Sequence, residues 1–301
     1  MKRDICTLLD KNYLLRGLAL YDSLREHCPQ FTLWMLCMDE ESHELLRKLN
    51  LKDIRLLRVS EVEDDRLKET KPTRTSTEYC WMFSSSLPLY ILEKNKDIDM
   101  VAYIDADIYF YDSIEKIYDE FGSNSIMIIP HNSSKKNKWR EKISGIYNVG
   151  MMIFRNDANG LEALKWWKSR VIEWCFNRYE DGKFGDQLYL NDWPTRFNGV
   201  HILHNSGANV ASWNIDNFDF SSPLIFYHFH GLKIYLNKKD KIKVYPIGIL
   251  NKEIYNEYVE ALQRGFEKIK IVDNKWKYGF APRLGILRLV KQRIQNMLFL
   301  K

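Results

Sequence analysis

Apolar and polar positions alternate along the chain with two different periods. Residues 14, 18, 21 and 24 are apolar at helical spacing, whereas residues 5–9 form a short continuous apolar run. Short runs favour strands and longer periodic stretches favour helices. The expected strands are 5–9, 31–38, 54–59, 100–104, 126–129, 151–154 and 224–227, and the expected helices are 13–27, 40–49, 79–94 and 158–176.

This alternation of strands and helices predicts an α/β protein with a mostly parallel sheet flanked by helices on both faces. The charged, threonine-rich stretch 64–77 is expected to form a loop. Pro88 is expected to kink the helix over 79–94 or to mark its start. Ligands of such sheets bind at the carboxyl ends of the strands, so polar residues that directly follow an apolar run are the first candidates for a site.

The clearest candidates are Asp105 and Asp107, which directly follow the apolar run 100–104. Side chains two positions apart on an extended chain point to the same side. The two carboxylates can therefore share one divalent cation and leave coordination positions free for phosphate oxygens. A helix cap and a turn could use the same residues without a metal. Because two carboxylates in an apolar, aromatic stretch are costly to bury without a cation, we favour a metal site.

A histidine directly follows the expected strand 224–227. His228 is followed by Gly231 and Lys233. An imidazole beside two carboxylates favours Mn²⁺ over Mg²⁺, glycine allows backbone to approach a ligand closely, and lysine offers a charge to a phosphate. Taken alone, this stretch is more typical of a hydrogen-bonded histidine at a strand end and a surface lysine.

Other polar stretches are compatible with a site but do not define one. Asp186 and Gln187 follow Gly185 at the head of an expected helix that ends at residue 191, where they could serve the helix terminus or face a polar substrate. Asn148 is expected in a turn before the run 151–154, where its amide could bind sugar hydroxyls. Trp213, in a loop-like stretch, suits an acceptor site and the core equally well.

Charge and cysteine content narrow the classes of protein. The 301-residue chain carries a net charge of +5, but residues 1–273 hold 38 basic and 40 acidic side chains. A slightly acidic body argues against binding nucleic acid. The five cysteines have no CxxC spacing and are expected to be reduced thiols. With no expected signal peptide and no apolar run of spanning length, we expect a cytoplasmic protein or one peripheral to a membrane.

Five motifs, taken in order, are similar to those of a known family. They are residues 9–13, residues 103–107, Asn148 with Gly150, Asp186 with Gln187, and His228 with Gly231. Over roughly residues 4 to 235 the set resembles the nucleotide-sugar-dependent glycosyltransferases of the GT-A fold. The most similar family is glycosyltransferase family 8, which includes glycogenin and bacterial lipooligosaccharide galactosyltransferases. The resemblance implies a Rossmann-like GT-A sheet and sugar transfer from a nucleotide diphosphate sugar, with retention at the anomeric carbon.

The resemblance also implies roles for the motif residues. Asp105, Asp107 and His228 would hold Mn²⁺, or Mg²⁺, against the donor diphosphate. Tyr13 would stack on the base, and Asp186 and Gln187 would be catalytic. The residues implied to bind the donor, a UDP-sugar, are Leu8, Leu9, Asp10, Tyr13, Asp105, Ala106, Asp107, Asn148, Gly231 and Lys233.

The chain departs from the family pattern in two places. Lys233 follows His228 by five positions, whereas the family lysine follows by six and precedes Pro-Trp. The helix before the aspartates carries Ser84, Ser85 and Ser86 where the family tends to carry an arginine. Both departures concern the diphosphate side of the site and the choice of subfamily.

The end of the chain differs in character from the rest. Residues 1–245 are expected to form the catalytic domain, and residues 246–301 a helical, basic, amphipathic extension. Apolar residues at 287, 290, 294 and 297 share one helical face, and Arg288 and Arg293 lie on the other side. Such a helix suits an anionic membrane surface, and we favour this over a helix docked on the domain. It predicts a glycan or lipid-linked acceptor, as in lipopolysaccharide or surface polysaccharide assembly.

Two other functions stay open. A sugar-nucleotide pyrophosphorylase also combines an α/β sheet with a metal and a nucleotide, but that class usually has a glycine-rich loop after the first strand. Residues 9–12 contain no glycine. A non-catalytic nucleotide- or glycan-binding protein is the other alternative, and the complete set of aspartates and histidine argues against it.

Overall fold

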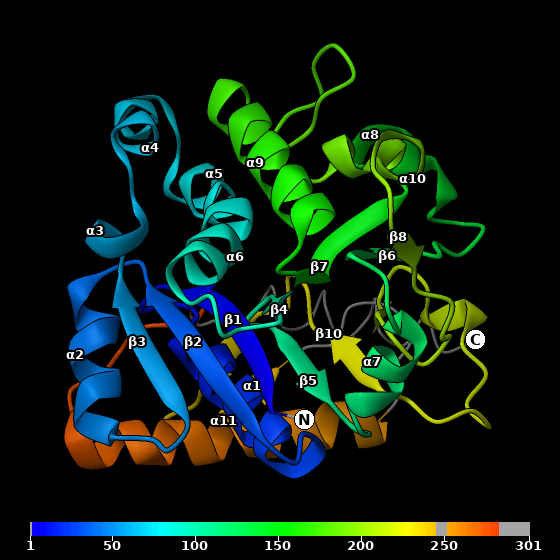
Figure 1. The fold of residues 1–301 in the computed structure, drawn as a ribbon. Helices are drawn as coiled ribbons and strands as arrows, with labels where there is room; N and C mark the ends of the chain where they lie inside the picture. The colour runs from blue at the N-terminus through cyan, green and yellow to red at the C-terminus, as the bar shows by residue number, and fades with distance from the viewer. Residues whose placement is uncertain (1, 245–251, 283–301) are drawn as a thin grey trace.

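A seven-stranded sheet forms the centre of the computed structural model, which describes residues 2–244 and 252–282. The strand order is β3-β2-β1-β4-β7-β6-β8 (Figure 1). Within this sheet only β7 runs antiparallel to its neighbours, so the expected mostly parallel sheet is confirmed. The strands are β1 (Arg3–Leu9), β2 (Phe31–Cys37), β3 (Ile54–Arg58), β4 (Met100–Ile104), β6 (Ile126–Pro130), β7 (Tyr147–Arg155) and β8 (Val200–Ile202).

The sheet separates two hydrophobic cores, because successive side chains on a strand point to opposite faces. In β4, Ala102 and Ile104 join the core on one face, and Val101 and Tyr103 join the core on the other. Helices α1 (Leu14–His27), α2 (Glu40–Leu49) and α11 (Lys252–Val272) cover the first face, and helices α6 (Phe83–Lys94) and α9 (Ala158–Glu173) cover the second. The shorter helices are α3 (Val59–Val62), α4 (Asp65–Thr70), α5 (Ser76–Trp81), α7 (Glu115–Phe121), α8 (Glu141–Ser144) and α10 (Trp193–Arg196).

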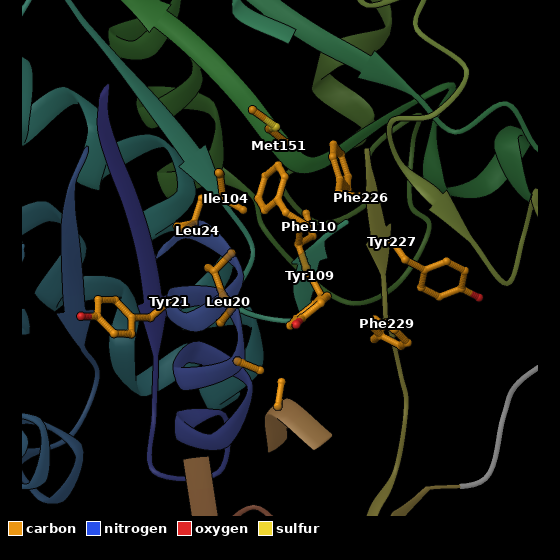
Figure 2. Close-up of a cluster of buried hydrophobic side chains, with 14 of the residues drawn as sticks. Leu20, Tyr21, Leu24, Ile104, Tyr109, Phe110, Met151, Phe226, Tyr227 and Phe229 are labelled. Atoms are coloured by element: carbon orange, nitrogen blue, oxygen red, sulfur yellow. The ribbon is translucent and has the colours of Figure 1, made fainter. Parts of the chain in front are cut away.

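The expected strand at 224–227 does not join the main sheet. It forms β10 (Phe226–His228), which lies between β5 (Ile108–Phe110) and β9 (Val210–Ala211) in a second, three-stranded sheet. Aromatic packing explains this position, because the rings of Phe110 and Phe226 lie 5.4 Å apart. They belong to the core shown in Figure 2, between α1 and the end of β4. A short hairpin, β11 (Ile234–Leu236) with β12 (Ile242–Val244), follows.

The expected loop at 64–77 is wrong, because this stretch contains α4 and the beginning of α5. Asp64 caps α4 by accepting a hydrogen bond from Leu67 N at 2.9 Å, and the Leu67 side chain is buried. Thr75 and Glu78 form a capping box at the start of α5. The expected helix 79–94 is divided between α5 and α6, and Pro88 lies inside α6 instead of at its start.

The described part of the predicted extension packs on the body of the protein. Helix α11 lies along α1, where a Cβ atom on Gly265 would be 3.3 Å from the Cβ of Leu18, and Lys268 Nζ pairs with Asp22 at 2.8 Å. After α11 the chain returns to β11, where Ala281 N donates to Ile234 O at 2.7 Å. The domain boundary after residue 245 stays a prediction.

The predicted amphipathic segment with apolar positions 287–297 lies outside the described residues. Among the helices of the described ranges, none combines the length and the hydropathy required to cross a membrane.

The contact between α1 and α11 gives a first testable prediction. Gly265→Leu would force a large side chain against Leu18, and overpacking of a tight contact typically costs about 1–3 kcal/mol. We therefore expect urea denaturation to give a free energy of unfolding about 2 kcal/mol lower than that of the wild type. Glu260→Leu places the same side chain on the exposed part of α11 and should leave the stability within about 0.5 kcal/mol. Equal stabilities of all three proteins would contradict this close contact.

Candidate functional site

The turn between β4 and β5 presents the two predicted metal-binding aspartates. Asp105 follows the last residue of β4, and its backbone N donates to Gly150 O of β7 at 2.8 Å. The backbone oxygen of Asp107 accepts from Phe229 N at 2.8 Å, just after β10. Main-chain hydrogen bonds from two neighbouring strands therefore fix both positions at the carboxyl end of β4, near the middle of the sheet.

His228, the last residue of β10, lies beside both carboxylates. Its Nε2 is 3.1 Å from Asp107 Oδ1 and 3.7 Å from Asp105 Oδ2. The His228 side chain is 1% exposed and that of Asp107 is 7% exposed. Nε2 pairs with Asp107, but neither buried ring nitrogen makes a hydrogen bond of regular geometry with a described residue. Buried polar atoms normally have partners, so these nitrogens fit a bound cation.

Burial and charge determine the protonation of this cluster. Burial raises the pKa of Asp105, although the neighbouring His228 opposes the rise. Burial also acts to raise the pKa of Asp107, but the adjacent His228 outweighs this effect and lowers that pKa. The pKa of His228 is raised, because the two carboxylates outweigh the effect of its burial. The cluster therefore favours a positive charge at its centre.

His230 is a candidate ligand that the sequence analysis did not single out. Asp107, His228 and His230 each offer a ligand atom, and these atoms lie within 4.8 Å of one another. His230 stands two residues after His228, and this spacing repeats that of Asp105 and Asp107. The same argument that selected the aspartates could therefore have found it.

Gly150 makes room for the histidine. A Cβ atom at this position would lie 2.7 Å from His228 Nδ1 and 2.5 Å from Asn148 Oδ1. Any other residue would displace the imidazole or the amide, so the Asn148-Val149-Gly150 motif has a steric reason in this fold.

Asn148 and Gln187 form a second part of the site. The sequence analysis expected Asn148 in a turn, which is wrong, because it is the second residue of β7. As β7 runs antiparallel, its first residues lie at the edge where the parallel strands end. Asn148 Nδ2 donates to Gln187 Oε1 at 3.1 Å, and Gln187 Nε2 donates to Ser144 O at 2.6 Å. The two amides thus orient each other.

Asp186 is buried next to these amides. Ser84 Oγ of α6 donates to its Oδ2 at 2.5 Å, and Trp167 Nε1 of α9 donates to its backbone oxygen at 2.8 Å. The following helix is 3₁₀ in type and spans Leu188–Asp192, with no side-chain cap. Burial raises the pKa of Asp186 to about 7, although the Ser84 hydrogen bond opposes this shift. Ser84 is one of the three serines that stand where the resemblance predicts an arginine. This departure therefore places a hydroxyl directly on the Asp186 carboxyl.

A cavity of about 420 Å³ joins these groups. Its lining includes the predicted site residues Asp105, Asn148, Asp186, Gln187 and His228. Trp213, which the sequence analysis could assign to either the core or an acceptor site, also lines it, with its ring 5.3 Å from that of His228. Lining residues that the sequence analysis did not select include Tyr103, His131, Arg140, Ser144 and His230.

The other predicted donor-binding residues do not line this cavity. Tyr13 is 41% exposed, and Gly231 and Lys233 are also exposed. The Asp10 carboxylate accepts hydrogen bonds from the backbone N of Asn12 and of Tyr13 at 2.9 and 3.0 Å, so it holds the turn between β1 and α1. Of the remaining residues, Leu9 and Ala106 are buried and Leu8 is half-buried.

Arg16, which the sequence analysis missed, joins the two loops of this group. Its buried guanidinium donates to Leu232 O at 2.6 Å and to Asn12 O at 3.2 Å, and it lies 4.6 Å from the centroid of the Tyr13 ring. Its charge also contributes to the lowered pKa of Asp107. The only signal in the sequence was an arginine within an otherwise apolar helical stretch.

Comparisons with known proteins support the fold and the resemblance to glycosyltransferase family 8. Residues 4–206 match the model of the family described as Glycosyl transferase family 8. Two similar proteins come from Bacillus subtilis (strain 168). The uncharacterized protein YfnF is 34% identical over 246 residues, which cover 76% of this chain and 81% of that protein. The uncharacterized protein YfnD is 29% identical over 295 residues, which cover 93% and 95%.

Solved structures show the same architecture. The galactosyltransferase LgtC, solved with donor and acceptor sugar analogues, matches with a TM-score of 0.54 and 17% identity over 89% of this chain and 95% of LgtC. The glycosyltransferase GlyE of Streptococcus pneumoniae TIGR4 matches with a TM-score of 0.51 and 14% identity over 94% of this chain and 66% of GlyE. The expected GT-A fold is confirmed.

The buried Asp186 carboxyl makes stability depend on pH. Because its folded pKa of about 7 exceeds the ordinary value of 3.8, ionisation at higher pH costs folding free energy. Asp186→Asn should therefore unfold at higher urea concentration than the wild type above pH 7, with a gain of at most about 4 kcal/mol. The two proteins should converge as the pH falls toward 3.8. Asp65→Asn, at a fully solvated carboxylate, is the control. A constant difference across this pH range would contradict the shifted pKa.

Proposed function

The chain belongs to glycosyl transferase family 8, and on that premise we propose that it transfers a sugar from a UDP-sugar to a glycan or lipid-linked acceptor with Mn²⁺ or Mg²⁺. The observation that carries the proposal is the convergence of Asp105, Asp107 and His228, in which the buried His228 Nε2 faces both carboxylates. Membership of this family supports a nucleotide-sugar glycosyltransferase. The identities of the metal, the nucleotide and the acceptor are what we propose.

The donor set at β4 and β10 suits a divalent cation. Asp105, Asp107 and His228 would hold it, and His230 is placed to assist. When bound, such an ion neutralises negative charge on the departing nucleoside diphosphate. The mixture of carboxylate and imidazole ligands favours Mn²⁺.

The exposed residues around the β1–α1 turn are suited to the rest of the donor. The Tyr13 ring offers a face to the base, beside the Arg16 guanidinium. Gly231 is exposed and has a φ of +69°, a conformation that favours glycine, and a residue without a side chain lets a ligand approach the backbone closely. Lys233 is exposed and offers a charge to the diphosphate. Arg16 acts as a positioning residue, because it ties the Tyr13 turn to the loop that carries Gly231.

The cavity at the start of β7 is suited to the donor sugar and the acceptor. Carboxylate and amide groups at Asp186, Asn148 and Gln187 accept and donate hydrogen bonds to hydroxyls. Gln187 is held by Asn148 and Ser144, so its orientation is fixed before substrate binds, and preorganised polar groups stabilise developing charge most effectively. A transferring sugar develops oxocarbenium character, which nearby carboxylate and amide oxygens favour. We assign Asp186 and Gln187 to this step and expect retention at the anomeric carbon.

Assembly of lipopolysaccharide or another surface glycan, on the cytoplasmic face of a membrane, is the setting that we propose. The predicted basic extension supports it. A pyrophosphorylase has less support, because the turn after β1 contains no glycine and is closed by the Asp10 carboxylate.

Calorimetric titration of UDP into the purified chain tests the nucleotide and the metal together. We expect binding in Mn²⁺ that chelation abolishes, and a loss of at least about tenfold in affinity in Asp107→Asn, because this isosteric change removes a charged metal ligand. Asp65→Asn, at an exposed carboxylate, should bind like the wild type. Wild-type protein that binds no UDP with either cation, or binds it equally well in chelator, would refute the proposal.

Arg16 gives a separate test of the donor side. Arg16→Met keeps much of the apolar volume but removes the hydrogen bonds to Leu232 O and Asn12 O. We expect UDP affinity in Mn²⁺ to fall about tenfold, since each charged hydrogen bond contributes about 1.5–3 kcal/mol. Arg16→Lys should recover part of it. Circular dichroism and thermal unfolding establish that the variants are folded, and a folded Arg16→Met with wild-type UDP affinity would show that the two loops need no such link.

A further inference from the structure

A basic segment with exposed apolar side chains borders the cavity. Residues 135–146 belong to the connection from β6 to β7 and contain a 3₁₀ turn and α8 (Figure 1). Trp139 is 57% exposed, Ile143 39% and Ile146 46%. The structure describes all nine tryptophans of the chain. Trp139 is exposed to solvent, and the other eight are buried or half-buried. Trp139 and Ile143 are four residues apart on consecutive helical turns, so they share one side of the segment.

The same segment is strongly positive. It contains Lys135, Lys136, Lys138, Arg140 and Lys142 against a single acid, Glu141. Lys136 pairs with Asp216, and Lys138 pairs with Glu141. Lys135, Arg140 and Lys142 make no ion pair with any described residue. The Arg140 guanidinium lies 5.5 Å from the centroid of the Trp139 ring. Three cations without an ion-pair partner, next to three exposed apolar side chains, are complementary to a surface that is both anionic and apolar.

The position of this segment relates it to catalysis. Arg140 and Ser144 line the cavity that holds Asp186 and Gln187, and Ser144 O accepts the hydrogen bond that orients Gln187. A surface that covers residues 135–146 would therefore lie at the mouth of the cavity.

We propose that the 135–146 segment docks on an anionic phospholipid membrane and brings the mouth of the cavity to the lipid surface. Tryptophan and isoleucine side chains partition into the interface below the headgroups, and lysine and arginine bind the lipid phosphates. This membrane contact is distinct from the one predicted for residues beyond 282. Its use for catalysis rests on the proposed lipid-linked acceptor, since docking would present such an acceptor to the cavity without extracting it from the membrane.

Quenching of Trp139 fluorescence by brominated lipids tests the contact directly, because the other eight tryptophans are buried or half-buried. The full chain is mixed with vesicles of equal parts phosphatidylglycerol and phosphatidylcholine that carry bromines on their acyl chains. We expect these vesicles to quench the fluorescence of Trp139, and brominated vesicles of phosphatidylcholine alone to quench it little. Trp139→Phe should still sediment with the anionic vesicles but lose most of the quenching.

Vesicle sedimentation of matched variants tests which residues carry the affinity. Lys135→Glu combined with Lys142→Glu should reduce affinity for the anionic vesicles at least about tenfold, because each lysine near an anionic membrane surface contributes substantially to binding. Ile143→Ser should also weaken binding. Ile271→Ser, which removes an isoleucine 86% exposed on α11, should leave vesicle binding unchanged.

Two outcomes would overturn the proposal. One is a wild-type chain that does not bind anionic vesicles. The other is binding without quenching of Trp139 and without loss in the Lys135/Lys142 and Ile143 variants, which would place the contact elsewhere on the chain. UDP titration of the same proteins separates this result from the proposed function. Docking variants should bind UDP in Mn²⁺ like the wild type, whereas a wild type that binds vesicles but no UDP would refute only the proposed function.

Discussion

Strand β7 runs against both of its neighbours, and the hydrogen bond from Asp105 N to Gly150 O fixes the point where it meets β4. In a purely parallel sheet only the ends of strands reach the functional edge. Here the first residues of β7 reach it as well, so Asn148 and Gly150 stand beside Asp105 without a connecting loop. Gly150 then leaves the space that the His228 ring occupies. The proposed metal site and the amide pair thus depend on one pairing of strands.

Buried negative charge is the second constraint on the site. Asp105, Asp107 and Asp186 lie close enough for the charge of Asp105 to raise the pKa of Asp186. Two positive groups offset this charge inside the protein: His228, in contact with the metal-site carboxylates, and Arg16, held by carbonyl oxygens. Arg16 makes no ion pair among the described residues, so its field remains available to an anion that binds beside it. An anionic donor and a cation therefore suit the site better together than either does alone.

The alternation of apolar runs predicted every strand of the central sheet except β8 (Val200–Ile202). The D-x-D pair was found because it directly follows one of the predicted strands. The errors have local causes. Residues 224–227 are as apolar as a central strand, but aromatic packing of Phe226 on Phe110 places them in a different sheet. Asn148 was assigned to a turn because the continuous apolar run begins only at Met151, after Gly150. The role of Arg16 could not be predicted from its place in an apolar helical stretch, because its partners are the backbone oxygens of Asn12 and Leu232. Leu232 is more than 200 residues away in sequence. Motifs reveal which side chains carry chemistry, but not the main-chain contacts that orient them.

The packing of α11 on α1 has a consequence for how the protein is made. The two helices meet at Gly265 and Leu18, but more than 200 residues separate them in the sequence. During synthesis α1 therefore leaves the ribosome long before α11 can cover it, and long-range contacts of this kind form slowly. Until α11 has been translated, part of the apolar surface of α1 is exposed to other proteins. Chaperone binding to residues 14–27 would shield that surface during this interval.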